Sequence, residues 1–366
     1  MDEDKIREFD ELLRSRPKVP RLCVFCGEPP ESNSPEHVIP QWLIRLTGDP
    51  KRSISVPRFE HDRGKILAMP FDQFVFPACH ACNSAYSDLE GAASRCMPSM
   101  LAGEPLAASD FVTLLQWFDK VRLGCWSAAR YHTQGLWPLS QNYSISQYIG
   151  GTDRGLIMFR LRDAPPGINF IGANSPIFQW TPCCLGVRIN DLLVICLAHQ
   201  WLVAKSLGFP FPAKMLYVGG MTMLDIRSGR ERVTSPVLPV LFRRDGVGIW
   251  QAIWPDDAVR MDHYQTAYVK DHQDTPKASV PFLESNGSRA RPYPPTGSNS
   301  WLPGKGAQFH WDSMEDVIRS VLALQWRLWE IHAPEIAPDD FWAKETLRVR
   351  TAMARGFLKT MGLPSL

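Results

Sequence analysis

The sequence carries no strong excess of charge of either sign. Its 40 lysine and arginine residues against 38 aspartate and glutamate residues leave a formal net charge of +2. Such a balance permits nucleic-acid binding but does not indicate it as a strongly basic chain would. There is also no internal repeat of fixed period, which excludes the repeat architectures.

Long apolar segments are lacking as well. The N-terminal segment MDEDKIREFDELLRSRPK begins with acids and contains no apolar stretch, so we expect neither a secretory signal nor a transit peptide. The most apolar stretch, residues 192–203, includes His199 and is shorter than a membrane-spanning helix. We therefore expect a cytoplasmic protein with no membrane segment.

Cysteine is present in an odd number, nine residues. A reducing compartment favours metal binding over disulfide formation for closely paired cysteines. Two pairs have the Cys-x-x-Cys spacing, Cys23 with Cys26 and Cys79 with Cys82. We expect the other five to be buried thiols: Cys96, Cys125, Cys183, Cys184 and Cys196.

The composition, with 45% hydrophobic residues, is sufficient for a sizeable core and predicts an α+β protein of two parts. We expect a zinc-containing module over residues 1–100 and a larger α+β domain of unassigned type over residues 101–366. Residues 271–303, rich in Pro, Ser, Gly and Asn, are expected to form a loop or linker.

Apolar periodicity predicts the main elements. Residues 71–77 alternate like a strand that leads to Cys79, and a helix is expected to open at Asn83 with Asn83, Ser87, Glu90 and Gly91 on one face. Short strands are expected in residues 143–260. Further helices are expected over residues 3–15, 109–130, 190–207, from Ser313 onward, and 339–361.

Four thiolates can hold one zinc ion in a tetrahedron, because each Cys-x-x-Cys turn brings two sulfurs to the same ion. The two turns lie on either side of Glu36-His37-Val38-Ile39-Pro40, and Asn83 follows the second turn directly. A zinc ion with four cysteine ligands has no open position for water, so its role is expected to be structural. A carboxylate and an imidazole near such a site could instead act on a phosphodiester.

These motifs resemble, in order and spacing, the zinc-containing branch of the HNH endonuclease family, which has a ββα-metal core. The resemblance covers residues 20–95. It implies a DNA endonuclease with one catalytic divalent cation, Mg²⁺ or Mn²⁺, in addition to the structural zinc. It further implies that His37 is the general base, that Glu36 is a ligand of the catalytic cation, and that Asn83 orients the segment bearing the histidine.

The sequence departs from the family pattern at the third position. Many members have His or Asn eight or nine residues after the central Asn, where this chain has Gly91 and Ala92. Glu90 is the best substitute as a carboxylate ligand, with Asp88 beside it. His61-Asp62 and His80 have no role in the family pattern.

Three hypotheses follow. The first is the endonuclease, with DNA as substrate and a role as an effector in bacterial anti-phage defence or restriction, a context that the resemblance implies. The second is a zinc-stabilised nucleic-acid-binding or RNA-directed module without cleavage. In the third, residues 101–366 bind a protein partner or an activating ligand, and the zinc region only stabilises the fold.

Overall fold

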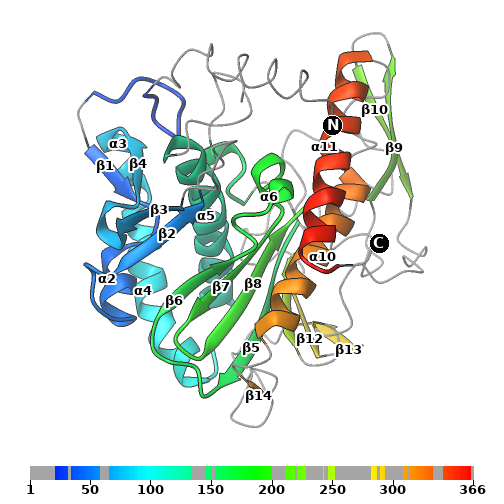
Figure 1. Cartoon of the computed structure of the whole chain (residues 1–366). Coiled ribbons are helices and arrows are strands. Elements are labelled where there is room, and N and C mark those ends of the chain that lie inside the picture. Colours follow the sequence, from blue (N-terminus) through cyan, green and yellow to red (C-terminus); the bar gives the residue numbers. More distant parts are fainter. Residues whose placement is uncertain are drawn as a thin grey trace. The chain divides into compact units, whose positions relative to one another are not determined.

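The computed structural model describes residues 21–31, 34–57, 66–132, 145–150, 153–199, 211–218, 221–227, 242, 246–251, 282–286, 289–292, 308–310, 314–332 and 341–363 (Figure 1). The chain forms two compact units. Unit 1 comprises residues 1–88 and 123–147, and unit 2 comprises residues 89–122 and 148–366. Helices and sheets occur in both units, so the predicted α+β class is confirmed.

Unit 1 is built around two antiparallel strand pairs. Strand β1 (Ser34–His37) pairs with β4 (Val75–Ala78), and β2 (Ser53–Pro57) pairs with β3 (Ile66–Pro70). The short helix α2 (Gln41–Leu46) follows β1 and buries Leu43 and Ile44. A 3-10 turn, η1 (Phe71–Gln73), precedes β4, so only the second half of the strand expected over residues 71–77 is extended.

Three helices follow β4 in the chain. Helix α3 (His80–Ala85) and helix α4 (Ser87–Ala102) are separated by a turn at Tyr86, and α5 (Ala108–His132) comes next. Helix α5 confirms the helix predicted over residues 109–130. The Asp110 carboxylate accepts a hydrogen bond from the Ala107 N–H (2.9 Å), which satisfies a donor that a helix start leaves open.

The main sheet of unit 2 has the strand order β13-β12-β11-β5-β8-β7-β6, and a further strand, β14, pairs with β5 in parallel. The other neighbours are antiparallel. Their bounds are β5 (Arg154–Arg162), β6 (Ile168–Ile171), β7 (Cys184–Ile189), β8 (Leu192–Ala198), β11 (Val247–Gln251), β12 (Phe282–Asn286), β13 (Arg289–Pro292) and β14 (Gln308–His310).

Helix α10 (Met314–His332) packs on this sheet through Val317, Val321, Leu324 and Leu328. Its other side, with α6 (Pro176–Trp180) and α11 (Phe341–Thr360), forms a second apolar cluster that includes Trp326, Trp329, Ala354 and Leu358. Figure 1 shows α10 and α11 in orange and red beside the green sheet strands. Both helices confirm the C-terminal helices predicted from periodicity.

A separate hairpin in unit 2 pairs β9 (Phe211–Val218) with β10 (Met221–Arg227). Its register shifts between Asp225 and Ile226, which marks a β-bulge. Among the described residues, no helix is both long and apolar enough to cross a membrane.

The predicted buried helix over residues 190–207 is wrong for its described part, because Leu192–Ala198 form strand β8. All seven residues of β8 are buried, so the strand is apolar on both faces and has no alternating pattern. Ile189 pairs with Leu192, and Asn190 between them has φ 54°, a conformation that Asn tolerates in tight hairpin loops. Residues 200–207 lie outside the described part of the chain.

The loop predicted over residues 271–303 contains two strands, β12 and β13, in its described portion. Asn286 pairs with Arg289, and the two residues between them in the sequence are Gly287-Ser288, a dipeptide typical of two-residue hairpin loops. The loop was predicted from the high Pro, Ser and Gly content of the whole segment 271–303, and the hairpin signal of this one dipeptide was missed. The helix predicted over residues 3–15 lies outside the described residues.

Candidate metal centre

The first Cys-x-x-Cys segment folds as a tight turn. The Gly27 N–H donates to the Cys23 carbonyl oxygen (2.8 Å), and the Cys23 N–H donates to the Glu28 carbonyl oxygen (2.7 Å). Gly27 has φ 81°, a left-handed conformation that is strained for residues with a side chain. The turn therefore depends on this glycine, which directly follows Cys26.

The second segment begins helix α3. Cys79 is the residue before the helix, and its carbonyl oxygen accepts from the Asn83 N–H (3.0 Å), which closes the first turn. Cys82 lies three residues after Cys79. A helical turn thus brings both sulfurs to the same side. The helix opens at His80, three residues before the predicted start at Asn83.

The four sulfur atoms of these segments form one cluster. The Sγ atoms of Cys23, Cys26, Cys79 and Cys82 all lie within 4.8 Å of one another, and those of Cys26 and Cys79 are 3.9 Å apart. A zinc ion with Zn–S bonds of about 2.3 Å would separate its sulfur ligands by about 3.8 Å. The donor set and spacing fit a zinc ion, so the four cysteines could hold a metal as predicted.

The electrostatics of the cluster favour a bound cation. Burial raises the pKa of the Cys26 and Cys82 thiols, whereas a hydrogen bond from Cys82 lowers the pKa of Cys79. Several thiolates cannot accumulate at this spacing without a compensating charge. A divalent metal would supply that charge and stabilise the deprotonated form of all four ligands.

An aromatic contact holds the first turn against the rest of unit 1. The Phe25 ring is fully buried, stacks on Tyr86 (centroids 4.7 Å apart) and meets the edge of Phe76 (5.6 Å). The Val24 N–H also donates to the Pro77 carbonyl oxygen (3.0 Å). Because Phe76 and Pro77 belong to β4, these contacts tie the cysteine turn to the strand that precedes the second pair.

Glu36 and His37 are the last two residues of β1. In the register with β4, Glu36 lies opposite Phe76 and His37 opposite Val75. Successive side chains of a strand point to opposite faces, and the two residues differ in burial: Glu36 is 8% exposed, and His37 is half-buried.

A residue to which the sequence analysis gave no role, Gln41, contacts His37. Its Nε2 atom lies 3.1 Å from Nε2 of His37, and its Oε1 atom accepts from Arg45 Nη2 (3.1 Å). Gln41 and Arg45 are four residues apart on α2, a spacing that places them on one helix face. The four-residue spacing of Gln41 and Arg45 was the sequence signal that could have identified this pair. The contact with His37 depends on the bend at Val38 and Ile39, between β1 and α2.

Asn83 is half-buried within α3. Because the turn at Tyr86 interrupts the helix, the face predicted to join Asn83 with Ser87, Glu90 and Gly91 is not continuous. Two other residues considered from the sequence, His80 and Asp88, are exposed. His61 and Asp62 lie outside the described residues.

Glu90 belongs to unit 2 and pairs with a buried lysine. Lys120 Nζ lies 2.5 Å from Glu90 Oε1, and the lysine side chain is only 4% exposed. Within the part of the chain that the structure describes, the four cysteines are the only group of three or more His, Cys, Asp or Glu residues close enough to share a metal ion. Glu36 and Glu90 belong to no such group.

Comparison with known proteins gives no relative from which a function could be transferred. No protein-family model matches the chain, and neither a curated protein nor a solved structure matches it significantly.

Proposed function

We propose that the chain is a metal-dependent endonuclease of the HNH type that hydrolyses phosphodiester bonds in DNA. The observation that carries the proposal is the cysteine cluster, which joins the turn before β1 to the first turn of helix α3, directly after β4. Glu36 and His37 lie on β1, next to β4, and α3 follows β4 with Asn83. This strand, strand and helix order is the one that the ββα-metal resemblance implies.

In this proposal His37 accepts the proton of the attacking water, and Asn83 orients the segment that carries His37. Glu36 binds Mg²⁺ or Mn²⁺. Water and phosphate oxygens complete the coordination, as is usual for Mg²⁺. The cation would neutralise charge on the scissile phosphate. The zinc ion, with four cysteine ligands, would be structural. Glu90 is a second carboxylate ligand only if it leaves Lys120.

The test is cleavage of supercoiled plasmid by the purified full chain with Mg²⁺, Mn²⁺ or EDTA. We expect metal-dependent nicking or linearisation by the natural chain and its loss in His37→Ala. The matched control is His80→Ala, which removes an exposed histidine from the same unit. Zinc content is measured in parallel. Inactivity with full zinc content indicates loss of the catalytic cation, and inactivity with reduced zinc content indicates loss of the structural one. Equal cleavage by His37→Ala would disprove the assigned base.

Two contacts favour the second candidate, a zinc-stabilised nucleic-acid-binding module without cleavage. Gln41 occupies the Nε2 side of His37, and Lys120 engages Glu90. A module of this kind would bind nucleic acid with an affinity that falls with salt and that His37→Ala leaves unchanged. It would cut neither plasmid DNA nor a linear RNA under any of the metal conditions.

Unit 2 is the larger unit, and we propose that it targets or controls the activity through a protein partner or an activating ligand. A nuclease controlled in this way would suit an effector of bacterial anti-phage defence or restriction. A nuclease that cuts plasmid without any partner would contradict control by activation. Comparing cleavage before and after addition of a host-cell extract tests this point.

A further inference from the structure

The end of β1 and helix α2 bring three polar side chains into contact one after another, starting from the proposed base. His37 Nε2 lies 3.1 Å from Nε2 of Gln41, and Gln41 Oε1 accepts a hydrogen bond from Nη2 of Arg45 (3.1 Å). Only the Gln41 carboxamide, whose C=O and C–N bonds measure about 1.2 and 1.3 Å, separates the two contacts. Nε2 of His37 and Nη2 of Arg45 are therefore no more than about 9 Å apart.

The Arg45 guanidinium keeps most of its hydrogen-bonding capacity. A guanidinium has five N–H donors, and among the residues that the structure describes only Gln41 accepts a hydrogen bond from it. No carboxylate in that part of the chain lies within ion-pair distance of Arg45. The side chain is exposed, so its charge and its remaining donors are available to a ligand.

The segment around α2 has an excess of positive charge. Residues 38–53 contain three cations, Arg45, Lys51 and Arg52, and one acid, Asp49. Arg52 is half-buried and holds the connection after α2, because its Nη1 atom donates to two backbone carbonyl oxygens (3.1 and 2.8 Å). Its guanidinium therefore has a structural role. Arg45 and Lys51 are exposed and carry the charge that an anionic ligand would meet.

A guanidinium group is well suited to a phosphate. Its planar fork can donate two parallel hydrogen bonds to phosphate oxygens, and its charge is permanent. One DNA strand carries a phosphate for about every 3.4 Å of helix axis, so a distance of about 9 Å covers no more than about three nucleotides. A strand with one phosphate at His37 would thus bring another phosphate within reach of Arg45.

We propose that Arg45 binds a backbone phosphate of the DNA strand whose scissile phosphate lies at His37. The two phosphates are within about three nucleotides of each other. Gln41 holds the guanidinium on the side of His37, and the contact positions the strand without reading its bases. The inference deepens the proposed function and rests on it, because a DNA strand at His37 is what makes a phosphate the partner of Arg45.

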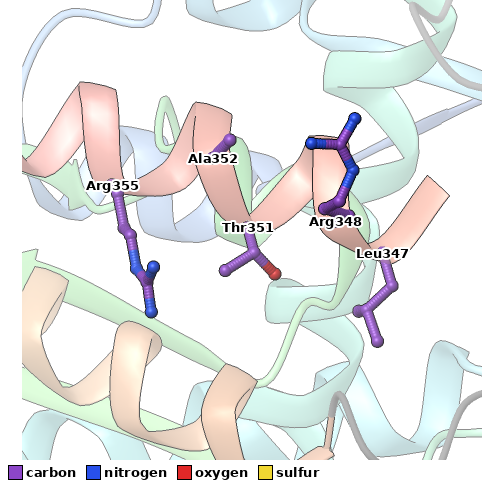
Figure 2. Close-up of a pocket in the computed structure, with 5 residues that line it drawn as sticks. All are labelled: Leu347, Arg348, Thr351, Ala352 and Arg355. Carbon is purple, nitrogen blue, oxygen red and sulfur yellow. The ribbon is translucent and has the colours of Figure 1, made fainter. Parts of the chain in front are cut away.

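Helix α11 in unit 2 also carries cations, but they do not converge in this way. A shallow hollow on α11 is lined by Leu347, Arg348, Thr351, Ala352 and Arg355. Figure 2 shows the guanidinium groups of Arg348 and Arg355 pointing away from each other. The Arg355 guanidinium lies 5.6 Å from the centre of the buried Trp326 ring, and no carboxylate of the described residues lies within ion-pair distance of it. Arg355 is also exposed, so it is a matched control for Arg45.

The experiment measures binding of a fluorescent DNA duplex to the full chain over a salt series, without added divalent cation. For Arg45→Gln we expect about tenfold weaker binding at low salt, as for the loss of one charge-assisted hydrogen bond. The slope of log K against log salt should become shallower by about 0.9, which corresponds to one phosphate contact. Arg45→Lys keeps the charge and should keep the slope. Arg355→Gln removes the same charge from α11 and should also keep it.

Gln41→Met distinguishes phosphate binding from a purely structural role of Arg45. It removes the acceptor of Arg45 but leaves the guanidinium charge, so the slope should equal that of the natural chain. If Arg45 only held Gln41 in place, Arg45→Gln would also leave the slope unchanged, and that result overturns the proposal. Circular dichroism checks that each variant is folded.

NMR of histidine-labelled protein tests where the strand lies. Duplex binding should shift the ring signals of His37, and unchanged signals overturn the proposal. So does a natural chain that does not bind the duplex. Because no cleavage is scored, a natural chain that binds DNA but never cuts it refutes only the nuclease. Conversely, metal-dependent cleavage with an unchanged slope in Arg45→Gln refutes only the phosphate contact.

Discussion

Gln41 and His37 face each other across the junction of β1 and α2, with their Nε2 atoms 3.1 Å apart. Arg45 can only donate hydrogen bonds, so the Gln41 atom that it contacts must be the carbonyl oxygen. The Gln41 amide nitrogen, a donor, then faces His37. Nε2 of His37 must accept this hydrogen bond, and the neutral ring carries its proton on Nδ1.

The contact predicts the effect of Gln41→Glu. A carboxylate at this position stabilises the imidazolium form of His37, because an opposite charge nearby favours the charged state. The NMR titration of the His37 ring should therefore move to higher pH. If His37 is the general base, the rise of cleavage with pH should move in the same direction. Gln41→Met is the control without charge, and an unchanged titration in Gln41→Glu would refute the contact.

The cysteine cluster predicts a metal content. Purified protein should contain one zinc per chain, and Cys79→Ser should lose it and unfold at a lower temperature, because metal binding to such a site also stabilises the fold. Cys96→Ser is the matched control, since Cys96 is half-buried but lies outside the cluster and contacts Asp110. Full zinc content in Cys79→Ser, measured by elemental analysis, would contradict the site.

Spacing along the chain predicted part of this structure well. Two cysteines three residues apart can share an ion through local structure alone, so each pair could be predicted to bind a metal, and the fold brings the two pairs together in one cluster. The long helices α5, α10 and α11 show their apolar faces over several turns. Leu192–Ala198 has no such pattern, because a strand buried on both faces is uniformly apolar and resembles a buried helix.

The partners of the site residues could not be predicted in the same way. Glu90 and Lys120 are 30 positions apart, and only the packing of α4 with α5 brings them together. The helix beginning at His80 also differs from the expected start at Asn83, since Cys79 itself takes the position before the helix. Charge pairs between elements depend on tertiary structure, which local patterns do not encode.

Variants of Glu90 and Lys120 distinguish two roles for Glu90. In one role it stabilises the fold through its ion pair with Lys120, and in the other it binds the catalytic cation. Glu90→Gln leaves a buried ammonium without its carboxylate and should lower the free energy of unfolding by about 2–4 kcal/mol. Adding Lys120→Met should restore most of it, because the ammonium that paired with the Glu90 carboxylate is then removed as well. Urea denaturation measures both effects. Cleavage retained by the double variant would show that Glu90 is not a ligand of the catalytic cation.

Asp119 on α5 is the shared acceptor of a buried network in unit 2. Its carboxylate lies 3.0 Å from Arg122 Nη2 and 3.7 Å from Arg154 Nη1, and it accepts from the Gly150 N–H (3.2 Å). The Arg154 Nε–H donates to Gln251 Oε1 (2.9 Å), which extends the network from β5 to β11. Burial lowers the pKa of Arg154, and Asp119 opposes that shift.

Two guanidinium groups that are almost completely buried thus depend on one carboxylate. Asp119→Asn keeps the shape of the side chain but removes its charge, so the free energy of unfolding should fall by about 3–5 kcal/mol. Glu315→Gln is the control, because it breaks the exposed pair with Arg319 and should cost less than about 1 kcal/mol. Urea denaturation of both variants checks the prediction. Equal losses would mean that the buried network stabilises unit 2 no more than a surface ion pair does.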